Sequence, residues 1–159
     1  MLSLDTGYAR DYSEGAAYRE YFVTDRLMFR VSKTDCRLRN KQEVLVMHLP
    51  DRAASDRVPV AIDAQFLRKH PVYGFTVGGE HYVVVTNTSG ANRVYRSNAT
   101  FPDRRQNTAI IDDNGDAWRL TESALVLDRD STRRLPRVAA QRAFWFGWYA
   151  QFPETILIK

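Results

Sequence analysis

The most regular pattern along the chain is a series of short apolar runs separated by turn residues. Each run is rich in valine, isoleucine, tyrosine or phenylalanine, the residue types that favour extended backbone. The pattern therefore predicts strands at 44–49, 58–62, 72–77, 81–86, 92–96 and 124–128.

Two glycine-containing turns predict hairpins within this series. Gly78 and Gly79 separate the runs 72–77 and 81–86, and Asn114-Gly115 lies inside TAIIDDNGDAWRLT. Gly-Gly and Asn-Gly suit tight turns because such turns need positive φ angles. The sequence thus predicts a mainly β fold of the β-rich α+β class, either an antiparallel meander sheet or a partly open barrel, with one or two short helices.

Helical signals are confined to two short segments. Residues 16–22 can form two turns with Ser13 as a cap. Residues 63–70 form the better candidate, because Asp63 can cap the first turn and Pro71 follows the last one.

The C-terminal segment RAFWFGWYAQF is the most aromatic part of the chain. As a strand it would place large rings on both faces, which is typical of a core strand covered on both sides. A helix is the alternative geometry, and a stacking platform for bases or sugars is the alternative role. We expect burial of Trp145, Phe146 and Trp148.

Length and composition indicate a single domain over residues 1–159. The chain is 44% hydrophobic and 26% charged, which is ordinary for a folded protein. No apolar run approaches the ~20 residues that cross a bilayer, and the first residues lack the regions of a secretory signal. We therefore expect a cytoplasmic protein without a membrane segment, or an exported one if the chain is a fragment.

The charge of the chain does not favour a nucleic-acid partner. The net charge is +4, from 23 basic and 19 acidic residues. A nucleic-acid surface usually concentrates basic residues with little acid between them, whereas the cluster at 129–137 is diluted by Asp130. We expect solvated surface arginines, and binding of single-stranded nucleic acid through Trp145, Trp148 and nearby arginines is the alternative.

A calcium-loop pattern at Asp112, Asn114 and Asp116 is incomplete. Such a loop needs glycine at its sixth position and glutamate at its twelfth, where this chain has Ala117 and Ser123. The same residues fit a hairpin turn, and we expect them to bind no metal.

The remaining candidate nucleophile and metal ligands are isolated in the sequence. Cys36 lies among basic residues that could lower a thiol pKa, but no partner base can be identified. The histidines at 48, 70 and 81 form no metal-binding motif. We therefore expect neither a metal nor a cofactor.

Several blocks resemble a bacterial and archaeal family called domain of unknown function 3179. These are LSLDTGYARDYSEGAAYREYF, LMFRV, the D-x-R-L-x-x-K arrangement from Asp35 to Lys41, and RAFWFGWYAQFPET. The resemblance spans almost the whole chain and corresponds to the latter portion of the family domain. It implies no activity, and the Cys-Pro-Leu-Cys motif of fuller members lies upstream of this chain.

The resemblance to a latter portion has a structural implication. A sheet-rich body without its first part exposes apolar surface and strand edges. A homodimer is the simplest way to cover them, although a self-sufficient shorter version and a fragment of a longer protein are alternatives.

Two functional hypotheses follow. The first is an uncharacterised non-catalytic binding or structural module, because no catalytic motif is found and turns, strands and aromatics explain the notable residues. The second is a small-molecule binding protein or an enzyme for an anionic or sugar-like ligand, with Asp5 or Asp35 as general base. The structural alternative for the second is an ion pair of Asp35 with Arg37 or Lys41. The candidate ligand-binding residues are Asp5, Arg10, Tyr18, Tyr21, Asp35, Arg37 and Lys41.

Overall fold

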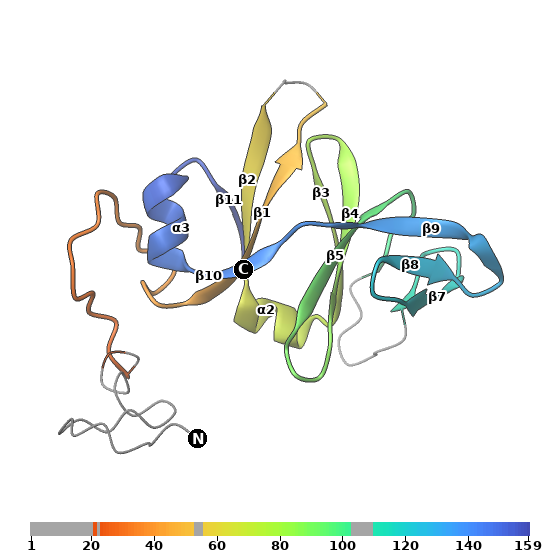
Figure 1. Ribbon diagram of the computed structural model, residues 1–159, viewed down its shortest axis with the longest axis horizontal. Helices are drawn as coiled ribbons and strands as arrows, with labels where there is room; N and C mark the ends of the chain where they lie inside the picture. The colour runs from red at the N-terminus through yellow and green to blue at the C-terminus, as the bar shows by residue number, and fades with distance from the viewer. Residues whose placement is uncertain (1–20, 22, 53–55, 103–109) are drawn as a thin grey trace, which may run out of the picture.

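The computed structural model describes residues 21, 23–52, 56–102 and 110–159, which form two β-sheets and two short helices (Figure 1). The mainly β prediction is confirmed. No helix within these ranges is long and apolar enough to cross a membrane. The elements are β1 (Glu43–Pro50), β2 (Arg57–Asp63), α2 (Ala64–Lys69), β3 (Val72–Val77), β4 (Glu80–Thr86), β5 (Asn92–Ser97), β6 (Ile110–Ile111), β7 (Ala117–Leu120), β8 (Ala124–Leu127), β9 (Asp130–Val138), β10 (Gln141–Phe144), α3 (Trp145–Gln151) and β11 (Ile156–Ile158).

The first sheet has four strands in the order β10-β1-β2-β11. β1 pairs antiparallel with both neighbours, whereas β11 runs parallel to β2. Because side chains alternate along a strand, β1 buries Leu45 and Met47 on one face and Val44 and Val46 on the other. Both faces of this sheet are therefore covered.

The second sheet has seven strands in the order β3-β4-β5-β9-β8-β7-β6, all antiparallel. Two meanders, β3-β4-β5 and β6-β7-β8-β9, meet where β5 pairs with β9. The predicted meander is thus confirmed, and neither sheet closes into a barrel. The arginine-rich segment 129–137 lies mostly in β9, where Leu135 is buried and Arg133, Arg134 and Arg137 are exposed.

Both predicted hairpins are present. Gly78 and Gly79 connect β3 to β4 with φ angles of 59° and 76°, and Gly115 has a φ of 83° between β6 and β7. These angles lie in the left-handed region that glycine adopts without steric cost. At Gly78 a side chain would also clash with the Pro50 carbonyl oxygen.

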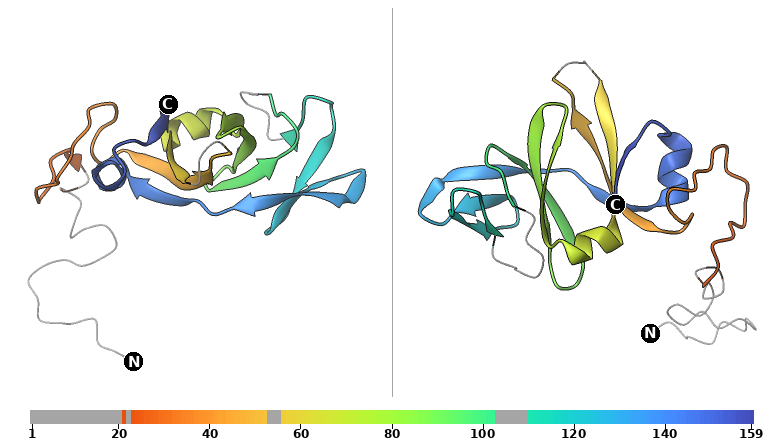
Figure 2. Two further views of the ribbon diagram at one scale, coloured as in Figure 1. Left: turned by 90° about the horizontal axis from the view of Figure 1, so that it is seen from above. Right: turned by 180° about the vertical axis from the view of Figure 1, so that it is seen from behind.

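Among the described residues, the core consists of three buried clusters arranged as layers. One lies between the two sheets and beneath α2, a second lies on the opposite face of the second sheet, and the third lies between the first sheet and α3. Figure 1 shows α3 on one side of the first sheet and the second sheet on the other. A single strand run, β9 followed by β10, passes from one sheet to the other (Figure 2).

The C-terminal aromatic segment is not one core strand, so that prediction is wrong. β10 ends at Phe144 and α3 begins at Trp145. The helical period puts Trp145 and Trp148 on one face, where both are buried against the first sheet, and Phe146 is only half-buried. No described side chain caps the start of α3; instead, the N–H groups of Trp145 and Phe146 donate to carbonyls in the loop before β1.

The helix predicted at 63–70 is confirmed as α2. The Asp63 carboxylate accepts a hydrogen bond from the Gln65 N–H at 3.0 Å, which caps the first turn. The helix predicted at 16–22 falls almost entirely outside the described residues.

Candidate functional site

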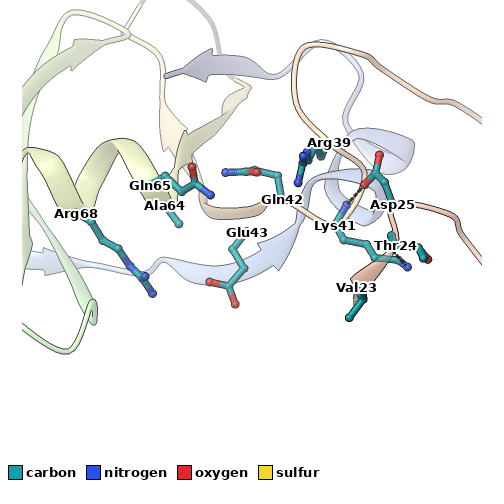
Figure 3. Close-up of a pocket in the computed structure, with 10 residues that line it drawn as sticks. All are labelled: Val23, Thr24, Asp25, Arg39, Lys41, Gln42, Glu43, Ala64, Gln65 and Arg68. Atoms are coloured by element: carbon teal, nitrogen blue, oxygen red, sulfur yellow. Dashed lines mark hydrogen bonds between the residues drawn. The ribbon is translucent and has the colours of Figure 1, made fainter. Parts of the chain in front are cut away.

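An open pocket of about 310 Å³ lies between the loop before β1, residues 23–25 and the first turns of α2 (Figure 3). Arg68 approaches it from α2, Lys41 and Asp25 lie on the opposite side, and Glu43 lies between them. We call it the α2 pocket. Its lining residues are Val23, Thr24, Asp25, Arg39, Lys41, Gln42, Glu43, Ala64, Gln65 and Arg68.

The capping interaction of α2 also positions the pocket wall. Oδ1 of Asp63 accepts the Gln65 N–H and, at 2.8 Å, the Gln42 side-chain amide. One carboxylate oxygen therefore joins the helix to the loop before β1. Because Arg68 lies one turn further along the helix, this joint also places the backbone of Arg68 on the helical side of the pocket.

The two carboxylates that line the α2 pocket in the described part of the chain are already engaged by protein groups. Asp25 accepts the Lys41 N–H at 3.1 Å and the Asn40 side-chain amide at 3.3 Å. Glu43 forms an ion pair with Arg142 at 3.2 Å. The charge of Glu43 is therefore balanced by Arg142, whereas the Asp25 carboxylate is held by neutral N–H donors.

The cations of the α2 pocket differ in how far they are engaged. The Lys41 ammonium donates to the carbonyls of Tyr21 and Thr24 and lies 3.5 Å from the centre of the Tyr21 ring. Arg39 and Arg68 are exposed and have no ion-pair partner among the described residues. The pocket therefore presents two guanidinium groups that can receive an anion.

Asp35 and Arg37 form a separate pair next to α3. Nε of Arg37 lies 3.0 Å from both Asp35 carboxylate oxygens, and its guanidinium lies 5.2 Å from the centre of the Trp145 ring. Partial burial acts to raise the pKa of Asp35, but hydrogen bonds from Arg37 and its charge outweigh it and hold that pKa below its ordinary value. Arg37 and Lys41 are the two ion-pair partners of Asp35 that the sequence suggests. The structure pairs Asp35 with Arg37.

The candidate ligand-binding residues therefore do not share one pocket in the described part of the chain. Tyr21 and Lys41 contact one another at the α2 pocket, whereas Asp35 lines a neighbouring pocket that shares Asp25 and Arg39 with it. The other three candidates, Asp5, Arg10 and Tyr18, lie outside the described residues.

Sequence reasoning missed Arg39 and Arg68 as candidate ligand contacts. Arg39 stands in a basic segment around Cys36, and Arg68 stands in the last turn of α2, where a cation is favourable whatever its function. Nothing in their sequence separation indicates that both line one pocket. The neighbouring pocket also exposes Cys36, for which no partner base is evident in the described region.

The residues of the incomplete calcium-loop pattern, Asp112, Asn114 and Asp116, form a turn that is held together by hydrogen bonds to the Asp112 carboxylate. Asp112 is buried and accepts three hydrogen bonds, from the N–H groups of Asn114 and Asp116 and from the Trp118 indole, at 2.9 to 3.1 Å. Within the described ranges, no group of three or more histidine, cysteine or acidic residues is arranged to hold a metal ion.

The comparisons with known proteins give a family but no activity. Residues 1–155 match the sequence profile of a family described as protein of unknown function (DUF3179). No curated protein and no solved structure matches the chain significantly.

Proposed function

The chain belongs to DUF3179, a family of proteins of unknown function, and we propose that it is a non-catalytic binding module for a small anionic ligand. The observation that carries this proposal is the pair of guanidinium groups, from Arg39 and Arg68, that line the α2 pocket without an ion-pair partner among the described residues. Guanidinium groups recognise carboxylate and phosphate oxygens through paired hydrogen bonds.

The state of the nearby carboxylates supports binding rather than catalysis. A general base must be free to take a proton and works best with a pKa near the working pH. Asp25 is hydrogen-bonded, Glu43 is paired with Arg142, and the pKa of Asp35 is held below its ordinary value by Arg37. Each group is thus engaged as an acceptor.

The size and openness of the α2 pocket suit a small ligand. Ligand pockets commonly have volumes of about 300–1,000 Å³, and this one, at about 310 Å³, lies at the lower end. Thr24, Gln42 and Gln65 add neutral polar groups beside the cations.

We also propose that residues 1–159 act as one domain.

Calorimetric titration with inorganic phosphate, citrate and neutral glucose tests the proposal. We expect an anion to bind and Arg39→Gln and Arg68→Gln each to weaken its binding about tenfold or more, because a charged hydrogen bond contributes about 1.5–3 kcal/mol. Arg134→Gln is the matched control, because Arg134 is an exposed arginine on β9 whose side chain hydrogen-bonds only to the Ser131 carbonyl among the described residues.

Two results would contradict this function. One is equal affinity of the control and the two pocket variants for the anion, which would place binding elsewhere. The other is binding of glucose with the same affinity as the anions, which would remove the role of charge.

A further inference from the structure

A second pocket, of about 280 Å³, lies between β1 and the connection from β9 to β10, which passes from one sheet to the other. One wall is the β9–β10 connection, from Val138 to Gln141, and the other includes Val46, His48 and Arg57. Trp148 of α3 completes it. We call it the seam pocket. None of the residues that line it lines the α2 pocket.

The sheet register turns main-chain groups of β1 toward the seam pocket. The Trp145 N–H donates to the Gln42 carbonyl, and pairing with β10 continues as far as Val46 opposite Gln141. Because main-chain groups alternate sides along a strand, His48 turns its N–H and C=O to the same side as Val46. β10 begins at Gln141, so no residue of that strand faces His48.

Aromatic rings are already arranged at the seam pocket. The His48 imidazole lies 5.0 Å from the Trp148 ring and 4.6 Å from the Phe152 ring, measured between centroids. The Trp148 indole N–H donates to the Thr155 hydroxyl at 2.8 Å, which holds the orientation of the ring. Such a wall favours the ring of a ligand, because aromatic pairs gain about 0.5–1.5 kcal/mol beyond burial.

Two polar side chains at the seam pocket have no hydrogen-bond or ion-pair partner within the described ranges. The His48 imidazole forms no hydrogen bond there, and the exposed Arg57 forms neither a hydrogen bond nor an ion pair. Arg57 therefore offers a cation at the rim, while Val46 and Ala140 provide apolar surface beside it.

We propose that the seam pocket binds a small aromatic carboxylate. Its ring would lie against Trp148 and His48, and its carboxylate would pair with Arg57. An apolar wall with few polar groups is the usual composition of a small-molecule site. The positive charge of Arg57 favours an acid, and the rings of Trp148 and His48 favour a planar aromatic ligand. The small volume of the pocket limits this ligand to one or two rings.

Tryptophan fluorescence with benzoate, and calorimetry with both benzoate and indole-3-acetate, test this inference on the full chain. We expect saturable binding, with quenching because Trp148 lines the pocket. Cyclohexanecarboxylate, which keeps the charge and loses the aromatic ring, should bind several-fold more weakly. Arg57→Gln should weaken binding of the aromatic acids about tenfold, and the matched control Arg134→Gln should not.

The two proposed sites respond to different variants, so they can fail separately. Arg39→Gln should leave binding of the aromatic acid unchanged, and Arg57→Gln should leave phosphate binding unchanged. Absence of saturable binding of both aromatic acids would overturn the inference. So would equal affinity of Arg57→Gln and the unsubstituted protein, or a cyclohexanecarboxylate affinity equal to that of benzoate.

Discussion

Replacement of Asp112 by alanine should be among the most destabilising single changes in the second sheet. Its side chain is 1% exposed and accepts two turn N–H groups and the Trp118 indole N–H. Alanine leaves all three donors without their acceptor. The indole is the most costly of them, because Trp118 is itself buried and water cannot readily replace the carboxylate.

The magnitude follows from the three hydrogen bonds. A hydrogen bond to a charged group contributes about 1.5–3 kcal/mol, and a buried donor left unpaired costs about 1–3 kcal/mol. The turn N–H groups of Asn114 and Asp116 lie on exposed or half-exposed residues and can bond to water. We therefore expect a loss of about 3–5 kcal/mol for Asp112→Ala, against a total stability of about 5–15 kcal/mol for a typical domain.

The Asp112→Asn variant separates the two kinds of contact. An amide keeps one oxygen for the turn N–H groups but places an NH₂ group opposite the indole N–H. We expect a loss of about 1.5–3 kcal/mol. In a Trp118→Phe background this cost should shrink, because the indole donor is gone, and the double-mutant cycle would measure the coupling.

Urea unfolding followed by fluorescence or circular dichroism provides the assay. Asp113→Ala is the control, because Asp113 is exposed and only its main chain is hydrogen-bonded in the described structure; we expect less than about 0.5 kcal/mol. Calcium should not shift either midpoint, because a ligand stabilises only a state that it binds. A loss for Asp112→Ala within about 1 kcal/mol of the control, or a calcium-dependent rise, would refute this account.

The other predictions concern the turn, the C-terminus, acid stability and association. Gly115→Val should cost about 1–2 kcal/mol by urea unfolding, because the φ of Gly115 is 83° and a β-branched residue resists positive φ. Gly115→Asn should recover much of this, because asparagine tolerates the left-handed region and no described atom lies within 4 Å of the added Cβ. Deletion of residues 142–159 should abolish cooperative melting, because a buried tryptophan such as Trp145 alone contributes about 3–5 kcal/mol; a melt like that of the full chain would contradict it. Asp35 has a pKa below its ordinary value in the folded state, so its contribution to stability is present above the ordinary carboxyl range and lost as the pH falls through the folded pKa. Asp35→Asn should therefore be destabilising near about pH 6, and this cost should shrink as the pH falls toward the folded pKa; a difference that stays constant with pH would count against the pairing with Arg37. We expect a homodimer of about 37 kDa by light scattering, twice 18.3 kDa, and a persistent mass of one chain would exclude it.

Local chemistry in the sequence determined most strands, the hairpins and α2. The runs 44–49 and 72–77 became β1 and β3 because β-branched and aromatic residues favour extended backbone. Gly79 and Gly115 mark the turns because they adopt positive φ, and Asp63 caps α2 through its own side chain. These signals depend on residues a few positions apart, so the elements can be predicted directly from the sequence.

The C-terminal segment shows where local reading fails. The residues from Phe144 to Phe152 are aromatic enough for either a buried strand or a buried helix, and Gly147 weakens the helical signal. The helix forms because the carbonyls of Asn40 and Gln42 receive its first N–H groups and because the first sheet presents Val44 and Val46 to its rings. Those partners lie about a hundred positions away in the sequence.

Both candidate pockets are likewise products of the tertiary structure. Arg39 and Arg68 come from a loop and a helix that the Asp63 side chain joins, and His48, Arg57 and Trp148 come from two strands and α3. The sequence determines which side chains are cationic or aromatic and which backbone is extended. Only the packing of the two sheets and α3 decides which of these groups lie together and which remain without a partner, because those contacts join residues that no short-range pattern connects.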